Sequence, residues 1–547
     1  MLQDLESLLS SFGVDSRREC EVLNKQQANI LYNQGTESIK RSLFGAIRVK
    51  NIEVVKHLFR AANDLAVSGQ GKVVFYPIST GNNWGYGSSL PNSLTDMAVI
   101  LDLSLLNKIE LVNEYLGIVR VEPGVTQGQL SQYFIDNKLP FMVPVTGAGA
   151  SCSILANALE RGYGITPHQD HFQALTDLKA ILPNGQHYQS PLSQISANAG
   201  QSDLVNQSYK WNVGPYLDGL FTQSGLGIVY QATIRLKRMP DGFDSFYINY
   251  KNENDLAGAI EFIKNTLEKF EGIVGSINLM DTLRIISMVK TNPNRDTGAI
   301  LSSAQIEEIS KQESVPAWTI VGSIYGEISI VKQVKKLIKK AAKPEADKII
   351  FSSDILVKTA RAVFTKIPDF LLPMIQARLG SLAAGIEIMK GKPNEIAKSL
   401  CYWRTPLPSQ LPAIKDPAKD KCGLLWYAPL IPMSPRSVIN FAEHVRSICR
   451  KHDIDPLITF TNLRYDLIDS TVPILFNQDC EESVKNAHAC LDELVSAGIQ
   501  KGYIPYRLNI NQQLNWFDGS LESDQMMQSI YNVFDTHGIN QVGRYGK

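Results

Sequence analysis

Apolar and polar positions in the first part of the chain follow two different periods. Residues 51–66 repeat apolar side chains at the spacing of an amphipathic helix, and the apolar, β-branched run 73–76 predicts a buried strand. Residues 117–125 predict a second strand that ends in a Pro-Gly turn, and an apolar helical face begins near Thr126. Short helices, strands and glycine turns continue, so we predict an α+β domain over residues 1–240.

The pattern changes at a Met-Pro-Asp-Gly turn after residue 238. Residues 241–500 contain repeated long helices and a few strands, such as residues 318–322 and the apolar stretch 424–432, which predicts one core strand. This style is typical of a cap domain inserted into another domain, and residues 501–547 are then expected to return to the first domain. A chain of 547 residues is too long for one core, which agrees with two domains.

Composition indicates an ordinary soluble protein. Hydrophobic residues make up 44% and charged residues 20%, and 54 Lys and Arg balance 54 Asp and Glu, so we expect no nucleic-acid partner. Lysines recur along an amphipathic helix over residues 332–343. We interpret them as a solvated face rather than as a patch for a membrane surface or an electron-transfer partner.

Several absences bear on location and metal binding. No stretch reaches the length of a membrane span, and residues 1–9 lack the basic start and apolar run of a signal peptide. Seven scattered cysteines without a Cys-x-x-Cys pair argue for a reducing compartment and against disulfides or a zinc site. His168 and His171 have no further ligands nearby in the sequence, so we expect no metal. We predict a cytoplasmic protein without a membrane span.

The candidate chemistry begins at residues 77–89, Pro-Ile-Ser-Thr-Gly-Asn-Asn-Trp-Gly-Tyr-Gly-Ser-Ser, directly after the predicted strand. Glycines let backbone N–H groups converge on an anion, and a diphosphate is the natural occupant of such a loop. The Gly-x-Gly-x-x-Gly fingerprint that opens a long helix in Rossmann domains does not occur here. Further small-residue and glycine segments follow at residues 144–151, 154–171 and 221–229.

This order of segments resembles the FAD-binding domain of the vanillyl-alcohol oxidase and p-cresol methylhydroxylase flavoproteins. The resemblance is dense over residues 73–236 and resumes at residues 401–404, 502–507 and 535–546. It implies an α+β, two-domain FAD-binding fold with an α/β cap inserted before the C-terminal segment. It also implies bound FAD, with the first loop at the diphosphate and the later glycine segments along the ribityl chain and the isoalloxazine.

Carried over residue by residue, the resemblance assigns a set of side chains and glycines to the cofactor. They are Pro77, Ser79, Thr80, Gly81, Asn82, Asn83, Gly85, Tyr86, Gly87, Pro144, Gly147, Ser151, Asn157, Gly162, Gly164, Thr166, Gly227, Ile228 and Arg544. In the family, Asp170 and His171 of a similar stretch are structural around the flavin site, and we interpret them in that way.

The positions that link the flavin covalently in relatives are changed. Some relatives use a histidine of the first loop, where this chain has Asn82 and Asn83, and others use a cap residue where it has Asp469 or Ser470. We therefore expect non-covalent FAD. The remaining candidates for a covalent link are Tyr465 and Cys152, and we interpret them as a packing tyrosine and a small buried thiol.

A Tyr-Arg pair and a first-loop tyrosine bind the substrate phenolate in the phenol-oxidising members. The matching positions are Tyr506, Arg507 and Tyr86, which we take as the catalytic residues. An arginine with two phenol hydroxyls stabilises a bound phenolate and lowers its pKa. The resemblance thus implies an FAD-dependent oxidoreductase that removes a hydride from a para-substituted phenol or related aromatic to flavin N5. Taken alone, the pair would read as a half-buried tyrosine beside a surface arginine.

Val145 departs from the family, which has a catalytic acid at this position in vanillyl-alcohol oxidase. Another carboxylate, such as Glu387 or Asp469, would have to replace it as the base for hydration of a quinone methide. Residues 401–404, Cys-Tyr-Trp-Arg, resemble a cap segment close to the substrate, and a core aromatic pair is the competing interpretation.

Three other functions remain open at this point. The first is an FAD-dependent 2-hydroxy acid dehydrogenase, in which Arg507 would hold a carboxylate. The second is a non-redox flavin enzyme of the alkylglycerone-phosphate synthase kind, and the third is a scaffold that has lost its flavin and only assembles with a partner. For the redox enzyme we expect a small aromatic substrate, a homodimer and, in a dehydrogenase, a cytochrome as electron acceptor.

Overall fold

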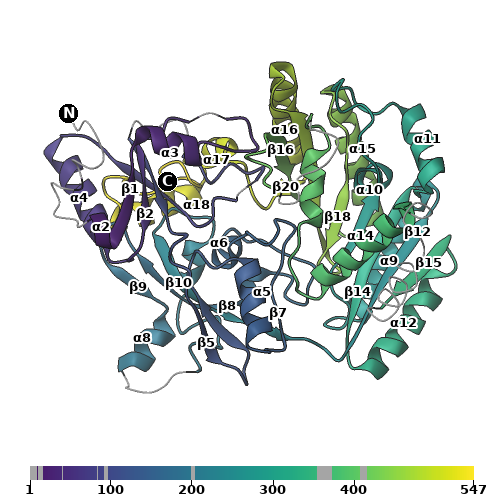
Figure 1. Ribbon diagram of the computed structural model, residues 1–547, viewed down its shortest axis with the longest axis horizontal. Coiled ribbons are helices and arrows are strands. Elements are labelled where there is room, and N and C mark those ends of the chain that lie inside the picture. The colour runs from purple at the N-terminus through teal and green to yellow at the C-terminus, as the bar shows by residue number, and fades with distance from the viewer. Residues whose placement is uncertain are drawn as a thin grey trace.

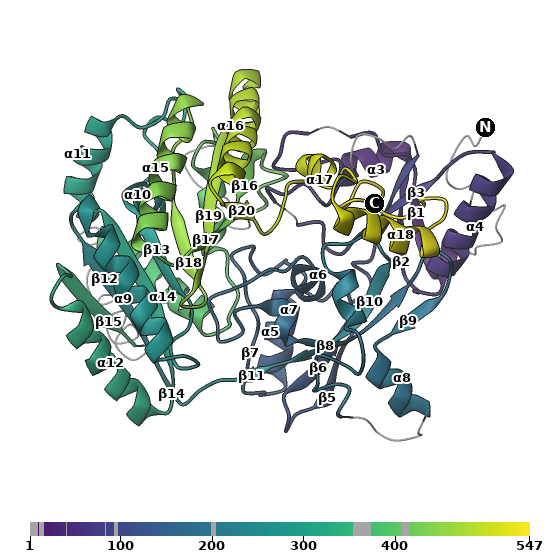
Figure 2. The same cartoon turned by 180° about the vertical axis from the view of Figure 1, so that it is seen from behind.

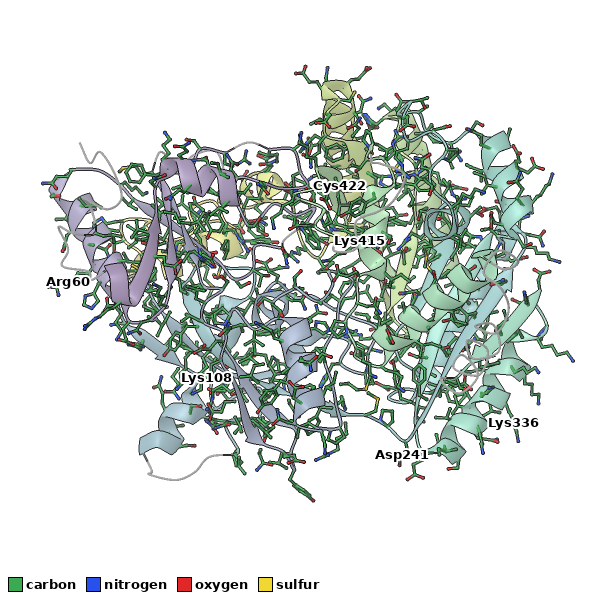
Figure 3. All side chains as sticks on the ribbon, viewed as in Figure 1. Arg60, Lys108, Asp241, Lys336, Lys415 and Cys422 are labelled. Carbon is green, nitrogen blue, oxygen red and sulfur yellow. The ribbon has the colours of Figure 1, made fainter. Side chains whose placement is uncertain are left out.

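The computed structural model describes residues 9, 16–39, 41–82, 84–91, 97–198, 204–353, 373–406 and 415–547. Within them the strands form sheets of four, five, two and nine strands. The smaller sheets lie on one side of the molecule and the nine-stranded sheet lies on the other (Figure 1). The chain passes from one side to the other near Asp241, on the connection labelled in Figure 3.

The four-stranded sheet carries the first glycine loop. Its order is β1 (Cys20–Leu23), β2 (Gly45–Val49), β4 (Ala98–Asp102) and β3 (Val74–Ile78), with β2, β4 and β3 parallel. Helix α4 (Val54–Ser68) packs on one face and α3 (Lys25–Tyr32) on the other. Because both faces are covered, its strands are continuously apolar, as parallel strands usually are. The loop leaves the carboxyl end of β3.

The five-stranded antiparallel sheet carries the later glycine segments. Its order is β5 (Ile109–Asn113), β6 (Ile118–Val121), β10 (Ile228–Arg235), β8 (Leu175–Ile181) and β9 (His187–Gln189). Beside it lie α5 (Gln127–Asp136), α6 (Ile154–Leu159), α7 (His171–Ala174), α8 (Pro191–Asn198) and the small sheet of β7 (Phe141–Met142) and β11 (Lys237–Arg238). Thr126 caps the start of α5, because its hydroxyl accepts a hydrogen bond from the Gln129 backbone amide. The helix therefore begins where the sequence predicts.

The nine-stranded sheet forms the other side of the molecule. Its strands are β12 (Gly242–Tyr250), β13 (Ile277–Asp281), β14 (Trp318–Gly326), β15 (Lys348–Ser352), β16 (Cys422–Tyr427), β17 (Pro429–Pro432), β18 (Thr459–Asn462), β19 (Leu467–Asn477) and β20 (Ile504–Pro505). Four helices build one core with it: α9 (Leu256–Lys269), α12 (Ile328–Ala342), α15 (Pro435–Lys451) and α16 (Glu481–Gln500). Four further helices complete this side: α10 (Thr282–Val289), α11 (Ser303–Glu313), α14 (Pro373–Met389) and η4 (Ile396–Tyr402).

The C-terminal segment connects the two sides. Strand β20 pairs with β17 of the large sheet, whereas α17 (Ile510–Trp516) and α18 (Glu522–Phe534) lie beside the four-stranded sheet in both views (Figures 1 and 2). Beyond α18, the Phe75 amide donates to the Ile539 carbonyl and the Gln541 amide donates to the Phe75 carbonyl, each at 2.8 Å. Tyr506 and Arg507 therefore lie where the chain crosses between the sheets.

Most elements expected from the pattern are confirmed, and one differs. The helix expected over residues 51–66 is α4, the strand at 73–76 is β3, and the lysine-rich helix is α12, whose Lys336 is exposed (Figure 3). The single core strand expected at 424–432 is wrong, because β16 and β17 are separate strands that pair with different parts of β19. Among the described helices, none combines the length and apolar character that a membrane crossing requires.

Candidate active site

A cavity of about 520 Å³ is lined by the loop after β3, by α6 and the segment behind it, by strands of the large sheet and by the C-terminal segment. The sequence-predicted residues that line it are Pro77, Ser79, Thr80, Gly81, Asn82, Tyr86, Gly147, Asn157, Gly162, Gly164, Gly227, Ile228, Tyr506, Arg507 and Arg544. Of the other described candidates, Gly85, Gly87, Pro144, Ser151 and Thr166 are not part of the lining. Asn83 lies outside the described residues.

The first half of the glycine loop is suited to a diphosphate. Within the described part of the chain, none of the backbone amides of residues 79–82 donates a hydrogen bond to a protein acceptor. Gly81 has φ +71°, a conformation that L side chains rarely adopt. The Asn82 side chain donates to the Ser151 carbonyl and hydroxyl oxygens at 3.1 and 2.9 Å, which joins the loop to the next glycine segment. Free amides in a cavity wall are the donors that a phosphate anion requires.

The second half of the loop binds a carboxylate of the protein itself. The Gly85 and Gly87 amides donate to Glu37 Oε1 at 2.8 and 3.1 Å. Glu37 is buried, and burial raises its pKa against the effect of these hydrogen bonds. A Cβ on Gly85 would lie 2.3 Å from the Trp426 side chain. These two glycines therefore hold the loop against the N-terminal segment, a role that the sequence pattern did not predict.

Beside α6, neighbouring atoms leave no space for a side chain at the glycine positions of the cavity wall. A Cβ at Gly164 would lie 2.1 Å from the Val145 carbonyl oxygen, so only glycine fits there. Asn157 Nδ2 lies 2.5 Å from His171 Nδ1, and burial lowers the pKa of His171 to about 3, which keeps the ring neutral. Asp170 caps α7 by accepting from the Gln173 amide. No cluster of metal-ligating side chains occurs among the described residues.

The predicted phenolate-binding residues meet in this cavity. Tyr506 and Arg507 lie in a bend directly after the short strand β20, not within a strand, so both side chains reach the cavity. The Arg507 guanidinium carbon lies 4.2 Å from the centroid of the Tyr86 ring. The Tyr506 ring lies 5.5 Å from the ring of Tyr163, a residue that the sequence analysis did not select.

A carboxylate from α6's C-terminal end organises the arginines. Glu160 Oε2 lies 3.1 Å from Arg507 Nη2, and Glu160 Oε1 pairs with Arg544. Burial disfavours the charged carboxylate, but the charges of Arg544 and Arg507 outweigh this and lower the pKa of Glu160. Two arginines thus share one carboxylate, which leaves one positive charge uncompensated by Glu160 at the cavity wall. Burial raises the pKa of Tyr86 to about 12 despite Arg507, so its hydroxyl stays a donor.

The cavity wall formed by the large sheet is polar. Asn278 and Thr461 face one another across β13 and β18 and line the cavity, and Thr461 also pairs with Asp469 of β19, which is not part of the lining. Asp469 is 7% exposed, and burial raises its pKa well above the usual value although the Tyr163 hydroxyl opposes the shift. Asp469 Oδ1 and the Tyr163 hydroxyl both lack a hydrogen bond of regular geometry within the described residues. A neutral carboxyl group therefore lies beside the tyrosine cluster.

Of the other residues that the sequence analysis considered, some line the cavity and some do not. Glu387 is exposed and does not line it, whereas Val145 lines it and is fully buried. Tyr465 is 42% exposed and lies outside the lining, so it is not the packing tyrosine that we expected. Cys152 is a buried thiol in the wall. Cys401 lines the cavity too.

The aromatic segment behind Cys401 belongs to the core. Trp403 Nε1 donates to Asp455 Oδ2 at 2.9 Å, and the Arg404 guanidinium lies 3.6 Å from the same oxygen. The structure thus favours the core interpretation for Trp403 and Arg404. Sequence reasoning also missed Arg284, although a signal was present, because it is the lone charged residue of the otherwise apolar helix α10.

The chain is similar in sequence to a known family and to two characterised enzymes. Residues 45–190 match a family described as an FAD binding domain. The 1'-carboxy-chondrochloren decarboxylase of Chondromyces crocatus is 28% identical over 481 residues, 86% of each chain. The flavoprotein subunit of 4-cresol dehydrogenase (hydroxylating) from Pseudomonas putida is 25% identical over 474 residues, which are 86% of this chain and 81% of that subunit.

Solved structures share the fold over almost the whole chain. The crystal structure of p-cresol methylhydroxylase with substrate bound superposes with a TM-score of 0.83 at 22% identity, covering 99% of this chain and 96% of the other. The 4-ethylphenol oxidase of Gulosibacter chungangensis, in complex with isoeugenol, gives 0.81 at 21% identity, covering 99% and 97%. The predicted α+β, two-domain FAD-binding fold is confirmed.

The free amides of residues 79–82 and the glycine-narrowed cavity fit FAD, in agreement with the matched family. Residues 79–82 would hold the diphosphate, and Gly162, Gly164 and Gly227 would lie along the rest of the cofactor. The chain is therefore an FAD-dependent oxidoreductase, with an FAD binding domain over residues 45–190 and the fold of p-cresol methylhydroxylase and 4-ethylphenol oxidase.

Proposed function

We propose that the protein oxidises a para-substituted phenol or a related aromatic, which it binds as the phenolate at Arg507, Tyr506 and Tyr86. The convergence of these three residues in the FAD cavity carries the proposal. Two relatives support it, since one is named for 4-cresol and one solved neighbour for 4-ethylphenol, both para-alkyl phenols.

The electrostatics of the cluster favour an anion. Arg507 remains charged, because Glu160 and the tyrosines raise its pKa against the effect of burial. Arg507 and Arg544 together carry two positive charges against the one negative charge of Glu160. The Tyr86 and Tyr506 hydroxyls, both protonated, add neutral donors. A phenol bound here has a lowered pKa, because its ionised form gains these interactions.

Bound FAD supplies the acceptor for a hydride that leaves the side-chain carbon next to the substrate ring. The protein's part is to hold the oxyanion, which pushes electrons toward that carbon, and to keep water away from it. Val145 provides an apolar wall where the family acid would stand. Asp469 does not line the cavity, but its carboxyl group interacts with the Tyr163 hydroxyl, and we propose that it exchanges a proton with bound substrate through Tyr163, which does line the cavity.

Decarboxylation is a second candidate outcome, supported by the name of the Chondromyces crocatus relative and by Val145. Hydration of a quinone methide needs a base, which an isopropyl side chain does not provide. Loss of carbon dioxide needs none, because the electron pair of the breaking C–C bond forms the new C=C bond while the ring returns to phenolate. A substrate of this kind would carry a carboxylate one carbon beyond the oxidised carbon.

The accompanying expectations remain proposals. A partner protein as electron acceptor is supported by the relative that is named a flavoprotein subunit. A homodimer and a cytoplasmic location follow from the sequence analysis alone.

The test is anaerobic mixing of the yellow holoprotein with para-alkyl phenols and, separately, with 2-hydroxy acids. We expect the phenols to bleach the flavin absorbance and the 2-hydroxy acids to leave it unchanged. Bleaching by hydroxy acids alone would favour the 2-hydroxy acid dehydrogenase instead. Retained absorbance with every phenol would overturn the proposal.

A further inference from the structure

Arg284 is a further cation that lines the cavity, and it comes from the side of the molecule built on the large sheet. It lies in the first turn of α10, which follows β13 of the large sheet, and its side chain lines the cavity. Within the described residues, the only hydrogen bond of its guanidinium goes from Nη1 to Ser287 Oγ at 3.2 Å, and no carboxylate forms an ion pair with it. Most of its donors are therefore available to a ligand.

The groups around Arg284 do not neutralise it. Asp281 is the carboxylate whose charge acts on it, but the Asp281 carboxylate accepts the Arg284 and Ile458 backbone amides at 2.9 and 3.1 Å. Cys401 is the other neighbour, and burial raises the pKa of its thiol to about 12. Burial lowers the pKa of Arg284 itself only to about 10, so it stays charged at neutral pH.

Lys398, another cation that lines the cavity, is already paired with a carboxylate of the protein. Its ammonium lies 2.6 Å from Glu395 Oε2 and donates to the Lys415 carbonyl at 3.1 Å. It also lies 4.7 Å from the centroid of the Trp84 ring. Arg284 and Lys398 thus differ in the property that matters for ligand binding, because only Lys398 has its charge met by a carboxylate of the protein.

The sheet places Arg284 at a distance from the phenolate site. Asp469, which acts electrostatically on Tyr506 and Tyr86, pairs across the sheet with Thr461. Thr461 lines the cavity, and so do both members of the next pair along the strands, Thr459 and Thr471, one two-residue step of roughly 7 Å further. Thr459 in turn faces Met280, next to the end of β13 and to α10. A ligand bound along this wall can reach both ends.

The wall between the two ends is partly apolar. Leu400 and Cys401 of η4 and Ile388 of α14 line the same cavity. An arginine without a carboxylate partner, set beyond an apolar stretch, is the arrangement that recognises an anion at the end of a hydrocarbon side chain.

We infer that Arg284 binds a carboxylate at the end of the substrate's para side chain, so that the substrate is a phenol with a carboxylated side chain, held at Arg507 by one end and at Arg284 by the other. This inference rests on the proposed phenol oxidation. Arg284 acts in it as a specificity-determining residue that touches the substrate, and the phenolate site is unchanged.

The test compares two isosteric substrates, 3-(4-hydroxyphenyl)propanoate and its neutral primary amide, with 4-ethylphenol as a reference that lacks the group. The dissociation constant of each is taken from the concentration dependence of the rate of anaerobic flavin reduction. For the parent protein we expect the acid to bind roughly 10- to 100-fold more tightly than the amide, as for an interaction with a charged group.

Arg284→Gln should abolish this preference and leave 4-ethylphenol unaffected, whereas Arg284→Lys should keep part of it. Lys398→Gln is the matched control and should keep the preference of the acid over the amide. If Arg284→Gln fails to fold, Arg284→Lys carries the test.

Three results overturn the inference. One is equal affinity of the parent for acid and amide, and another is an unchanged preference in Arg284→Gln. The third is an equal loss with 4-ethylphenol and the acid in that variant, which would assign Arg284 to the cofactor. A parent holoprotein that no phenol reduces would instead refute the proposed function, and the inference with it.

Discussion

The Glu160 carboxylate lies 3.1 Å from the Arg507 guanidinium and also pairs with Arg544. The proposed substrate anchor, Arg507, is therefore held in place by a carboxylate at the end of α6, which also binds Arg544 near the C-terminal end of the sequence. This pairing orients Arg507 before any ligand binds, and sharing one carboxylate between two cations preserves an excess of positive charge for an anionic substrate.

Replacing Arg507 is expected to weaken phenol binding and slow flavin reduction. Arg507→Ala removes an interaction with a charged ligand that contributes about 1.5–3 kcal/mol, or about tenfold or more in affinity. The rate of flavin reduction should fall as well, because the interaction strengthens toward the transition state. Arg507→Lys should restore little, since an ammonium lacks the guanidinium fork. Stopped-flow reduction measures both effects, and an unchanged rate in Arg507→Ala would show that the anchor lies elsewhere.

The tyrosine hydroxyls should set the pH dependence of reduction. Tyr86→Phe and Tyr506→Phe each remove a donor to the phenolate, so the apparent pKa of the bound phenol should rise and the pH profile of flavin reduction should shift upward. The loss at saturating pH should be milder than in Arg507→Ala. Because Tyr465 is exposed and outside the cavity, Tyr465→Phe serves as the control with an unshifted profile.

Glu160 should stabilise the folded protein in a pH-dependent manner. Its pKa is lower in the folded state than the unfolded value of about 4.3. The stabilisation is thus fully present above that value and is lost as the pH falls through the lower, folded pKa. Glu160→Gln should lower the free energy of unfolding by about 3 kcal/mol at pH 7, because it leaves two buried arginines without their carboxylate. Urea denaturation should show that the difference in unfolding free energy between the parent and Glu160→Gln is smaller below pH 4 than at pH 7. Glu307 forms an exposed ion pair with Lys311, and the control variant Glu307→Gln should leave the unfolding free energy unchanged at both pH values.

The cofactor is expected to be non-covalent FAD. Acid precipitation of the yellow protein should leave the flavin in the supernatant, and the intact denatured chain should have the mass of the unmodified sequence. The reason is chemical. Asn82 and Asp469 stand where relatives carry the residue that links the flavin covalently, and neither side chain forms a covalent bond to a flavin. A flavin-bearing peptide containing Cys152, the thiol in the cavity wall, would contradict this prediction.

Glu37 should control how firmly the first loop holds the cofactor. Glu37→Ala leaves the buried Gly87 amide without its acceptor, which costs about 1–3 kcal/mol, and leaves the Gly85 amide with the Thr36 hydroxyl alone. The loop that continues into residues 79–82 should loosen, and the protein should retain less FAD after gel filtration. Glu53→Ala, which removes an exposed partner of Lys56, is the matched control. Equal flavin content in both variants would argue against a role for Glu37.

Much of the fold could be predicted because its signals are local. The helical period of residues 51–66, the apolar run of β3 and the Thr126 cap each depend on neighbouring residues alone, and each element formed where expected. The stretch 424–432 was mispredicted for a non-local reason. Its two halves are both apolar, and only their pairing with different parts of β19 separates β16 from β17.

The sequence by itself determined the cofactor class and the identity of the glycine loops, because small residues at fixed spacing leave a recognisable pattern in one segment. Only the tertiary structure decided which charges meet. Glu160 lies 347 residues before Arg507 and 384 before Arg544, on the other side of the cap in the sequence, and Glu37 reaches Gly85 from the N-terminal segment. Whether a buried arginine is neutralised, as Arg507 is in part and Arg284 is not, depends on distances between segments that no local pattern encodes.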